Sequence, residues 1–135
     1  MQSHNTVGWF EIYVNDMERA RNFYQTVFAL ELEQMDMPEG MKSAGLEMWT
    51  FPADMETERY GAPGALVYMP ETPGFNVGPG GTIVYFMSQD CAVEAARVAE
   101  AGGTLIQDKM AIGEHGFIAM VQDSEGNMIG IHSDA

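Results

Sequence analysis

The sequence predicts an α+β fold built from two tandem βαβββ modules, with a curved, mainly antiparallel sheet cup and the helices on its outer side. Residues 8–28, GWFEIYVNDMERARNFYQTVF, have the pattern of a strand, a tight junction and a helix in succession. The same pattern returns 74 residues later, where Asp16 corresponds to Asp90 and Trp9 to Ile83. We therefore interpret the 135-residue chain as an internal repeat in one domain, with modules at about 7–69 and 82–133 and a linker at 70–81.

The first module contains a well-marked helix. Residues 7–14 form an apolar run that only Glu11 interrupts, and the run ends at Asn15 and Asp16, which are good helix caps. In residues 17–28, apolar side chains recur at three- and four-residue spacing, which predicts a helix with one buried face. We expect strands at 30–35, 46–51 and 64–69, a loop at 36–42 and a polar excursion at 53–61.

The second module repeats this order. A strand at 82–88 leads to a helix at 91–101, and Gly102 and Gly103 provide a C-terminal stop. A further strand begins at 104–107, and another is expected at 117–121. The segment DSEGN at 123–127 is a hairpin signal before the last strand, 128–132.

Composition narrows the function classes. Six basic residues against twenty acidic ones give a net charge of −14, which disfavours nucleic acids and anionic membranes as partners. No apolar run approaches the roughly 20 residues that span a bilayer, and the N-terminus lacks the pattern of a secretory signal. The single cysteine, Cys91, rules out an internal disulfide. We expect an acidic, cytoplasmic protein.

Strand alternation predicts a pocket lined by aromatic and methionine side chains. Trp9, Glu11 and Tyr13 share one strand face, and the repeat places Ile83, Tyr85 and Met87 in the corresponding positions. The predicted ligand-binding residues are Trp9, Glu11, Tyr13, Glu47, Trp49, Tyr85, Met87, Met128, Gly130 and His132. Among them, Glu11 and His132 are polar anchors and the candidates for proton exchange.

Each of these residues also has a structural interpretation. Trp9 and Tyr85 suit an ordinary core, because aromatic side chains dominate protein interiors. Glu11 would face solvent if the strand parity were shifted by one residue. His132 suits a hydrogen-bonding role, and Glu47, which shares a face with Trp49 and Phe51, is equally ambiguous.

Three stretches of the sequence resemble the vicinal oxygen chelate superfamily, which includes glyoxalase I, the bleomycin-resistance proteins and the extradiol dioxygenases. They are FEIYVNDMERARNFYQTVF at 10–28, AARVAEAGG at 95–103 and GFIAMVQDSEGNMIGIHS at 116–133. The resemblance covers nearly the whole chain, including the duplication. It implies the glyoxalase-like fold, whereas the reaction does not follow from the fold.

In the metal-using members, the resemblance implies four ligands, one from the first and one from the last strand of each module. The corresponding positions here are Trp9, Ile83, Gly130 and a residue at or near Gly64. A chelating site needs imidazole or carboxylate groups at about 2.0 to 2.2 Å, which these residues do not have. We therefore expect no metal at the usual site and no cofactor.

Two functions remain open from the sequence. The first is a metal-free protein that binds a small, largely apolar molecule in the sheet cup, as the resemblance to bleomycin-resistance proteins implies. The alternative is a metal-dependent lyase, isomerase or dioxygenase with a displaced site for a divalent metal, built from Glu11, His132 and Glu47. Family members commonly pair, and an open cup leaves apolar surface to cover, so we also expect a homodimer.

Overall fold

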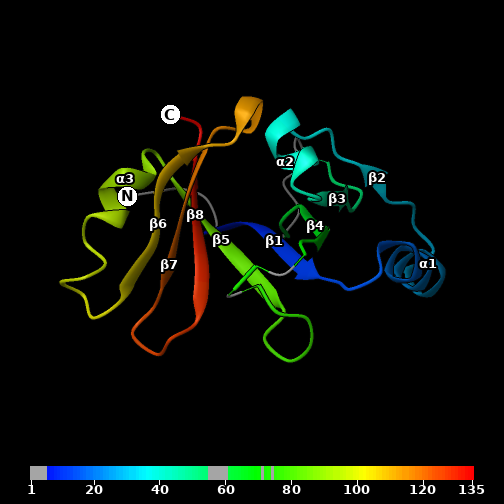
Figure 1. The fold of residues 1–135 in the computed structure, drawn as a ribbon, viewed down its shortest axis with the longest axis horizontal. Helices are drawn as coiled ribbons and strands as arrows, with labels where there is room; N and C mark the ends of the chain where they lie inside the picture. The colour runs from blue at the N-terminus through cyan, green and yellow to red at the C-terminus, as the bar shows by residue number, and fades with distance from the viewer. Residues whose placement is uncertain (1–5, 55–60, 71, 74) are drawn as a thin grey trace. The chain divides into compact units, whose positions relative to one another are not determined.

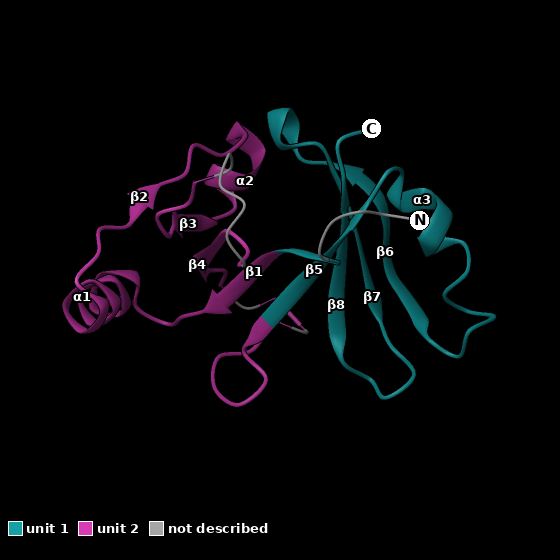
Figure 2. Cartoon of the chain, turned by 180° about the vertical axis from the view of Figure 1, so that it is seen from behind, with its two compact units in different colours: residues 1–8, 83–135 teal, residues 9–82 magenta. Residues whose placement is uncertain are grey.

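The structure is a computed structural model that describes residues 6–54, 61–70, 72–73 and 75–135. The chain divides into two compact units, residues 9–82 and residues 83–135 with the N-terminal stretch up to Gly8 (Figure 2). Each unit combines helices with strands in a mixed sheet (Figure 1). The α+β class that the sequence predicts is confirmed.

The unit of residues 9–82 has the βαβββ order. Its strands are β1 (Val7–Tyr13), β2 (Glu33–Gln34), β3 (Glu47–Thr50) and β4 (Gly64–Tyr68), and its helices are α1 (Met17–Phe28) and α2 (Glu39–Ser43). The strands lie side by side in the order β2-β3-β4-β1. The first and last strands, β1 and β4, are parallel, and the other pairs are antiparallel.

The unit of residues 83–135 repeats this topology. Its strands are β5 (Thr82–Ser88), β6 (Thr104–Ala111), β7 (Phe117–Gln122) and β8 (Met128–Ser133), with α3 (Cys91–Ala95) and the short 3₁₀ helix η1 (Gly113–His115). The order is β5-β8-β7-β6, and again the first and last strands are the parallel pair. Two modules of the same design are thus present, as the repeat predicts.

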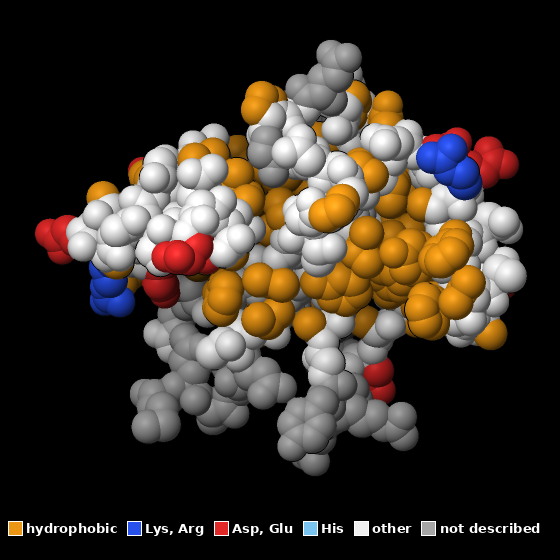
Figure 3. Space-filling view, turned by 90° about the horizontal axis from the view of Figure 1, so that it is seen from below, with side chains coloured by type: hydrophobic (Ala, Val, Ile, Leu, Met, Phe, Trp, Pro, Cys, Tyr) orange, Lys and Arg blue, Asp and Glu red, His pale blue; other side chains and the backbone are white. Residues whose placement is uncertain are grey.

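Helix α1 buries less of its apolar face than the sequence predicts. Asp16 caps it by accepting a hydrogen bond from the Arg19 backbone N–H at 3.0 Å, and Met17 joins Leu32 and Leu66 in the core. The later apolar residues Phe23, Val27 and Phe28 remain 56%, 56% and 61% exposed. Phe23 and Val27 lie beside the stripe that packs on the sheet, and Phe28 is the last helical residue, which explains their exposure. Figure 3 shows hydrophobic side chains gathered on one surface of the molecule.

The second helix is shorter than predicted. Helix α3 ends at Ala95, with Ala96 as its C-cap, and the expected residues up to 101 form successive turns instead. Most of these turns have the tighter three-residue spacing, as in the bond from the Val98 N–H to the Ala95 carbonyl, whereas the Ala101 N–H bonds at both spacings, to the carbonyls of Arg97 and Val98. The predicted stop is confirmed, because Gly102 has a φ of +94° and the Gly103 N–H bonds to the Val98 carbonyl.

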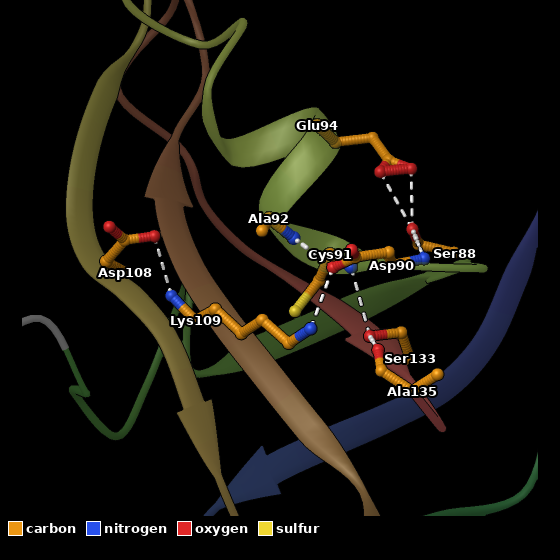
Figure 4. A network of polar contacts seen from close by, with 9 residues as sticks. All are labelled: Ser88, Asp90, Cys91, Ala92, Glu94, Asp108, Lys109, Ser133 and Ala135. Carbon is orange, nitrogen blue, oxygen red and sulfur yellow. Dashed lines mark hydrogen bonds and ion pairs between the residues drawn. The ribbon is translucent and has the colours of Figure 1, made fainter.

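A polar network anchors the start of α3 (Figure 4). Asp90 caps the helix by accepting from the Ala92 N–H at 3.1 Å, and it forms an ion pair with the Lys109 ammonium at 2.8 Å. The hydrogen bond from Lys109, assisted by the bond from Ala92, holds the pKa of Asp90 below its ordinary value. The Cys91 N–H donates to the Ser133 hydroxyl at 3.0 Å, which ties the helix to the end of β8.

Two further expectations differ from the structure, and a third lies mostly outside the described residues. The strand expected at 30–35 is reduced to the two residues of β2, and the loop expected at 36–42 contains most of α2. A five-residue helix is too short to produce the periodicity by which helices are recognised in a sequence. The excursion expected at 53–61 lies mostly outside the described residues, as do positions 71 and 74 of the linker.

Among the helices of the described residues, none is long and apolar enough to cross a membrane.

Candidate functional site

A buried carboxylate lies at the centre of the β1 face that carries Trp9, Glu11 and Tyr13. Glu11 is only 6% exposed. One of its oxygens accepts from the Tyr13 hydroxyl at 2.6 Å, and the other accepts from the Trp9 indole N–H at 3.0 Å. Alternate residues of a strand point to the same side, so these bonds confirm that the three residues share a face.

The surroundings of this carboxylate are apolar. In the parallel register of β1 and β4, Glu11 lies beside Ala65 and Tyr13 lies beside Val67, and both partners are completely or almost completely buried. Met48 of β3, also buried, is the neighbour of Val67 on the same face. A carboxylate among such residues depends on its hydrogen-bond donors, because burial otherwise favours the neutral acid.

Glu47 and Trp49 do not lie with Glu11, although the sequence-based pocket includes them. In the β3–β4 register, Trp49 is the neighbour of Leu66, and it packs in the core cluster of α1. The Trp49 indole N–H donates to Glu47 at 2.9 Å, and the Arg21 guanidinium carbon lies 3.4 Å from the Trp49 ring centroid. This placement corrects the prediction, since the two residues belong to the face of the sheet that α1 covers.

In the unit of residues 83–135, the predicted residues of β5 and β8 also share a face. Tyr85 lies beside Gly130, and Met87 lies beside His132. The Tyr85 ring covers Gly130 so closely that a Cβ atom there would come within 2.3 Å of it. Gly130 therefore gives its space to a ring rather than leaving an empty cavity. Ligand contacts of Tyr85, Met87, Met128 and Gly130 stay predictions.

His132 is held by a hydrogen bond within its own unit. Its Nε2 lies 2.6 Å from the carbonyl oxygen of His115, in the adjoining 3₁₀ helix. Because a carbonyl only accepts, Nε2 carries the proton in this contact. The imidazole is thereby oriented, and Nδ1 is the nitrogen that a neutral ring can use as an acceptor. This contact supplies the structural role that the sequence left open for His132, and its catalytic role stays a prediction.

The positions that correspond to the family's metal ligands do not fit a metal. Trp9, Ile83 and Gly130 lack carboxylate or imidazole donors. The register identifies Ala65, one residue after Gly64, as the counterpart of Gly130, because it lies beside Glu11 as Gly130 lies beside Tyr85. Among the residues that the structure describes, no three His, Cys, Asp or Glu side chains form a group that could hold a metal ion.

Sequence reasoning missed a groove at the ends of β1 and β4. It has a volume of about 590 Å³. Its described lining residues are Tyr13, Val14, Asn15, Tyr68, Met69, Pro70, Thr72, Pro73, Phe75, Asn76 and Val77. The segment 70–81 is rich in proline and glycine, so it was interpreted only as a linker. The aromatic residue Phe75 in this linker was the sequence signal that could have indicated the groove.

A second depression, of about 640 Å³, is lined by Ala29, Leu30, Glu31, Glu33, Thr50 and Pro52. Neither of the residues that donate to Glu11, Trp9 and Tyr13, lines this depression.

Comparisons with known proteins agree with this fold. A family model described as bleomycin resistance protein-like N-terminal matches residues 6–42. No curated protein matches the chain. A solved structure of methylmalonyl-CoA epimerase in complex with methylmalonyl-CoA and NH4+ is 16% identical, with a TM-score of 0.65, and covers 98% of this chain and 96% of its own. The epimerase from Mycobacterium tuberculosis is 13% identical, with a TM-score of 0.65 over 96% of this chain and 88% of its own.

A hypothetical protein from Bacillus halodurans C-125 is 15% identical, with a TM-score of 0.70 over 99% of this chain and 96% of its own. At these identities the structural likeness shows the fold alone. The resemblance to the vicinal oxygen chelate superfamily is confirmed, and the chain has the glyoxalase-like fold. Within that class, its first strand and helix are similar to those of bleomycin-resistance proteins.

Proposed function

We propose that this protein binds a small, largely apolar molecule against the sheet face that carries Trp9, Glu11 and Tyr13, without the metal of the chelating family members. The observation that carries the proposal is the buried Glu11 carboxylate, which two aromatic side chains hold by hydrogen bonds. A carboxylate fixed in apolar surroundings costs folding free energy, and such groups concentrate at functional sites.

The three residues have different roles in this proposal. Trp9 is half-buried, so part of its indole is free to make apolar contact with a ligand. Glu11 orients the ligand by a charge-assisted hydrogen bond or exchanges a proton with it. Tyr13 holds the carboxylate in place from the following inward position of the strand.

Fluorescence of Trp9 provides a direct test. The chain has two tryptophans, so a Trp49→Phe variant leaves Trp9 as the single reporter. A panel of small, neutral, apolar compounds should include ligands that quench this reporter and saturate. For such a ligand, Trp9→Ala, measured by calorimetry, should weaken binding about tenfold or more, and Glu11→Gln should weaken it less.

The matched control is a Trp9→Phe variant, in which Trp49 reports from the face covered by α1. It should not respond to the same compounds. If the compounds leave the fluorescence of Trp9 unchanged and quench that of Trp49, binding is on the sheet face covered by α1, and the proposal is refuted.

The alternative is a metal-dependent lyase, isomerase or dioxygenase with a displaced site. The position of Glu47 on the opposite sheet face from Glu11 removes one of its three candidate ligands. Elemental analysis should be done after the purified protein is offered nickel, zinc, iron and manganese in turn. We expect well under one metal ion per chain. A stoichiometric metal that disappears in Glu11→Gln or His132→Gln, together with catalytic activity, would favour the alternative.

We also propose that the protein forms a homodimer. Support comes from the apolar residues of α1 that remain more than half exposed, because exposed apolar groups of this kind are commonly covered by a partner. Sedimentation at micromolar concentration should give the mass of a dimer, and a Phe28→Ser variant should shift it towards the monomer. A wild-type protein that sediments as a monomer would contradict this.

A further inference from the structure

The groove at the ends of β1 and β4 has the character of a binding site separate from the Glu11 carboxylate. Its volume of about 590 Å³ lies in the range of small-molecule sites. The two strands are parallel neighbours, so their carboxyl ends meet at one edge of the sheet, and residues 72–73 and 75–77 lie against that edge. Two hydrogen bonds fix this edge, from the Tyr13 N–H to the Gly81 carbonyl at 2.8 Å and from the Val14 N–H to the Val67 carbonyl at 2.9 Å.

Aromatic rings form the walls of this groove. The rings of Tyr13 and Phe75 are in contact, with centroids 5.3 Å apart and planes inclined by 50°. Tyr68 lines the groove from the end of β4, and Pro70 and Pro73 add rigid apolar surface. Faces of this kind favour a flat ring, which packs against aromatic side chains at low conformational cost.

The charge of the lining is as informative as its shape. The chain as a whole carries −14, yet none of the described lining residues is Asp, Glu, Lys or Arg. The polar side chains there are the amides of Asn15 and Asn76 and the hydroxyls of Thr72 and Tyr68, since the Tyr13 hydroxyl donates to Glu11. Amides both donate and accept hydrogen bonds, which suits a neutral polar edge. An anion would meet the repulsion of the acidic surface with no cation in the described lining to offset it.

Tyr13 separates the groove from Glu11. Its ring lines the groove, and its hydroxyl donates to the carboxylate at 2.6 Å. The Tyr13 ring therefore stands between a molecule in the groove and the Glu11 carboxylate. Such a molecule does not need the carboxylate for its own contacts.

We infer that this groove binds an uncharged, planar ring compound that carries a hydrogen-bonding amide or hydroxyl group at one edge. The ring packs on Phe75, which contacts the buried Tyr13 ring, and the polar edge bonds to the side-chain amide of Asn76 or Asn15. The inference goes beyond the proposed function, since it concerns a set of residues that shares only Tyr13 with the proposed site.

The test uses three probes of one shape and different charge: 2-naphthamide, which is neutral, 2-naphthoate, an anion, and 2-naphthylmethylammonium, a cation. Binding to the full-length protein is followed by ¹H–¹⁵N NMR. The neutral probe should saturate and shift the backbone amides of Tyr68, Phe75 and Val77 and the side-chain amide of Asn76. The anion should bind at least tenfold more weakly because the acidic surface repels it, and the cation should bind no more tightly than the neutral probe because the described lining has no carboxylate for it.

Variants separate the groove from other surfaces. Phe75→Ala should weaken binding of 2-naphthamide about tenfold. The matched control Phe28→Ala removes an exposed ring from α1 and should leave binding within twofold. Asn76→Lys places a cation at the exposed rim, so it should strengthen binding of 2-naphthoate at least fivefold. The preference for the neutral 2-naphthamide over the anionic 2-naphthoate should become smaller.

Glu11→Gln distinguishes this inference from the proposed function, because it should leave 2-naphthamide binding within twofold. Shifts that map elsewhere would overturn the inference, as would equal loss in Phe75→Ala and Phe28→Ala or tighter binding of a charged probe. Failure of ligands to quench Trp9, with these shifts intact, would refute only the proposed function.

Discussion

Replacing Tyr13 with Phe should destabilise the protein by about 1.5–3 kcal/mol, which is the usual contribution of a hydrogen bond to a charged group. The structure places both partners in the interior, with Glu11 6% exposed and Tyr13 4% exposed, and the bond between them measures 2.6 Å. Phe keeps the ring and its contact with Phe75, so the loss is confined to the hydroxyl. The carboxylate would then keep the indole N–H of Trp9.

The same change should cost less when Glu11 is already Gln. An amide has one accepting oxygen, which the Trp9 N–H requires because an indole cannot accept. The Gln NH2 would then face Tyr13, whose hydroxyl accepts as well as donates. The bond becomes neutral, so Tyr13→Phe should cost only about 0.5–1.5 kcal/mol in the Glu11→Gln background. The expected coupling between the two sites is about 1 kcal/mol.

Urea unfolding at neutral pH, followed by far-ultraviolet circular dichroism, measures all four corners of this cycle. Tyr24→Phe, which changes a half-buried ring of α1, should stay within about 0.5 kcal/mol of the wild type. A Tyr13→Phe cost below about 0.5 kcal/mol, or equal costs in the two backgrounds, would refute the idea that a buried charge is held here.

Three other predictions concern the unit of residues 83–135 and the glycines. Lys109 lowers the pKa of Asp90 below its ordinary 3.8. The ionised Asp90 carboxylate should therefore stabilise the folded state fully above about pH 4, and this contribution should be lost as the pH falls through the pKa of the folded state. In urea titrations between pH 2 and 7, Asp90→Asn should lack this part of the loss of stability at low pH. Gly130→Ala should lower the free energy of unfolding by about 1–3 kcal/mol, because the new Cβ would lie 2.3 Å from the buried Tyr85 ring. Gly40→Ala in α2 has no neighbouring atom within 4 Å of its new Cβ, so it should leave the free energy of unfolding unchanged or raise it. Gly102→Ala should cost about 1–2 kcal/mol, since its φ of +94° favours glycine; a melting temperature equal to that of the wild type would contradict this.

The sequence predicted elements well where local signals and burial agree. Helix α1 begins after Asp16 and ends at Phe28 as expected, because an acidic cap and a long periodic stretch indicate the same boundaries. Strand β5 matches its expected range because its apolar run is bounded by Gly81 on one side and by the helix cap Asp90 on the other. Helix α2 was missed because Pro38 and Gly40 are strong turn formers, although proline is also well tolerated where a helix starts.

The candidate site was harder to predict because strand pairing decides which face of a strand meets which neighbour. Alternation within β1 placed Glu11 with Trp9 and Tyr13 correctly, since it needs only the spacing along one strand. The face of β3 depends on its register with β4, which the sequence does not contain, so Glu47 was assigned to the wrong side. The groove was invisible for a similar reason, because it requires the linker to fold back on the strand ends.

The chain contains the same local contact twice, and the comparison explains why only one of the two is a candidate for function. In β1 and in β3, an indole N–H donates to a glutamate two residues away, at 3.0 Å and 2.9 Å. Glu47 remains half-buried, on the face covered by α1, where packing and the cation of Arg21 account for the pair. Glu11 is buried beside Ala65 and accepts a second hydrogen bond, from the Tyr13 hydroxyl. Because folding alone would favour an apolar residue at that position, Glu11 is the one of the two glutamates that the function proposed above assigns to ligand binding.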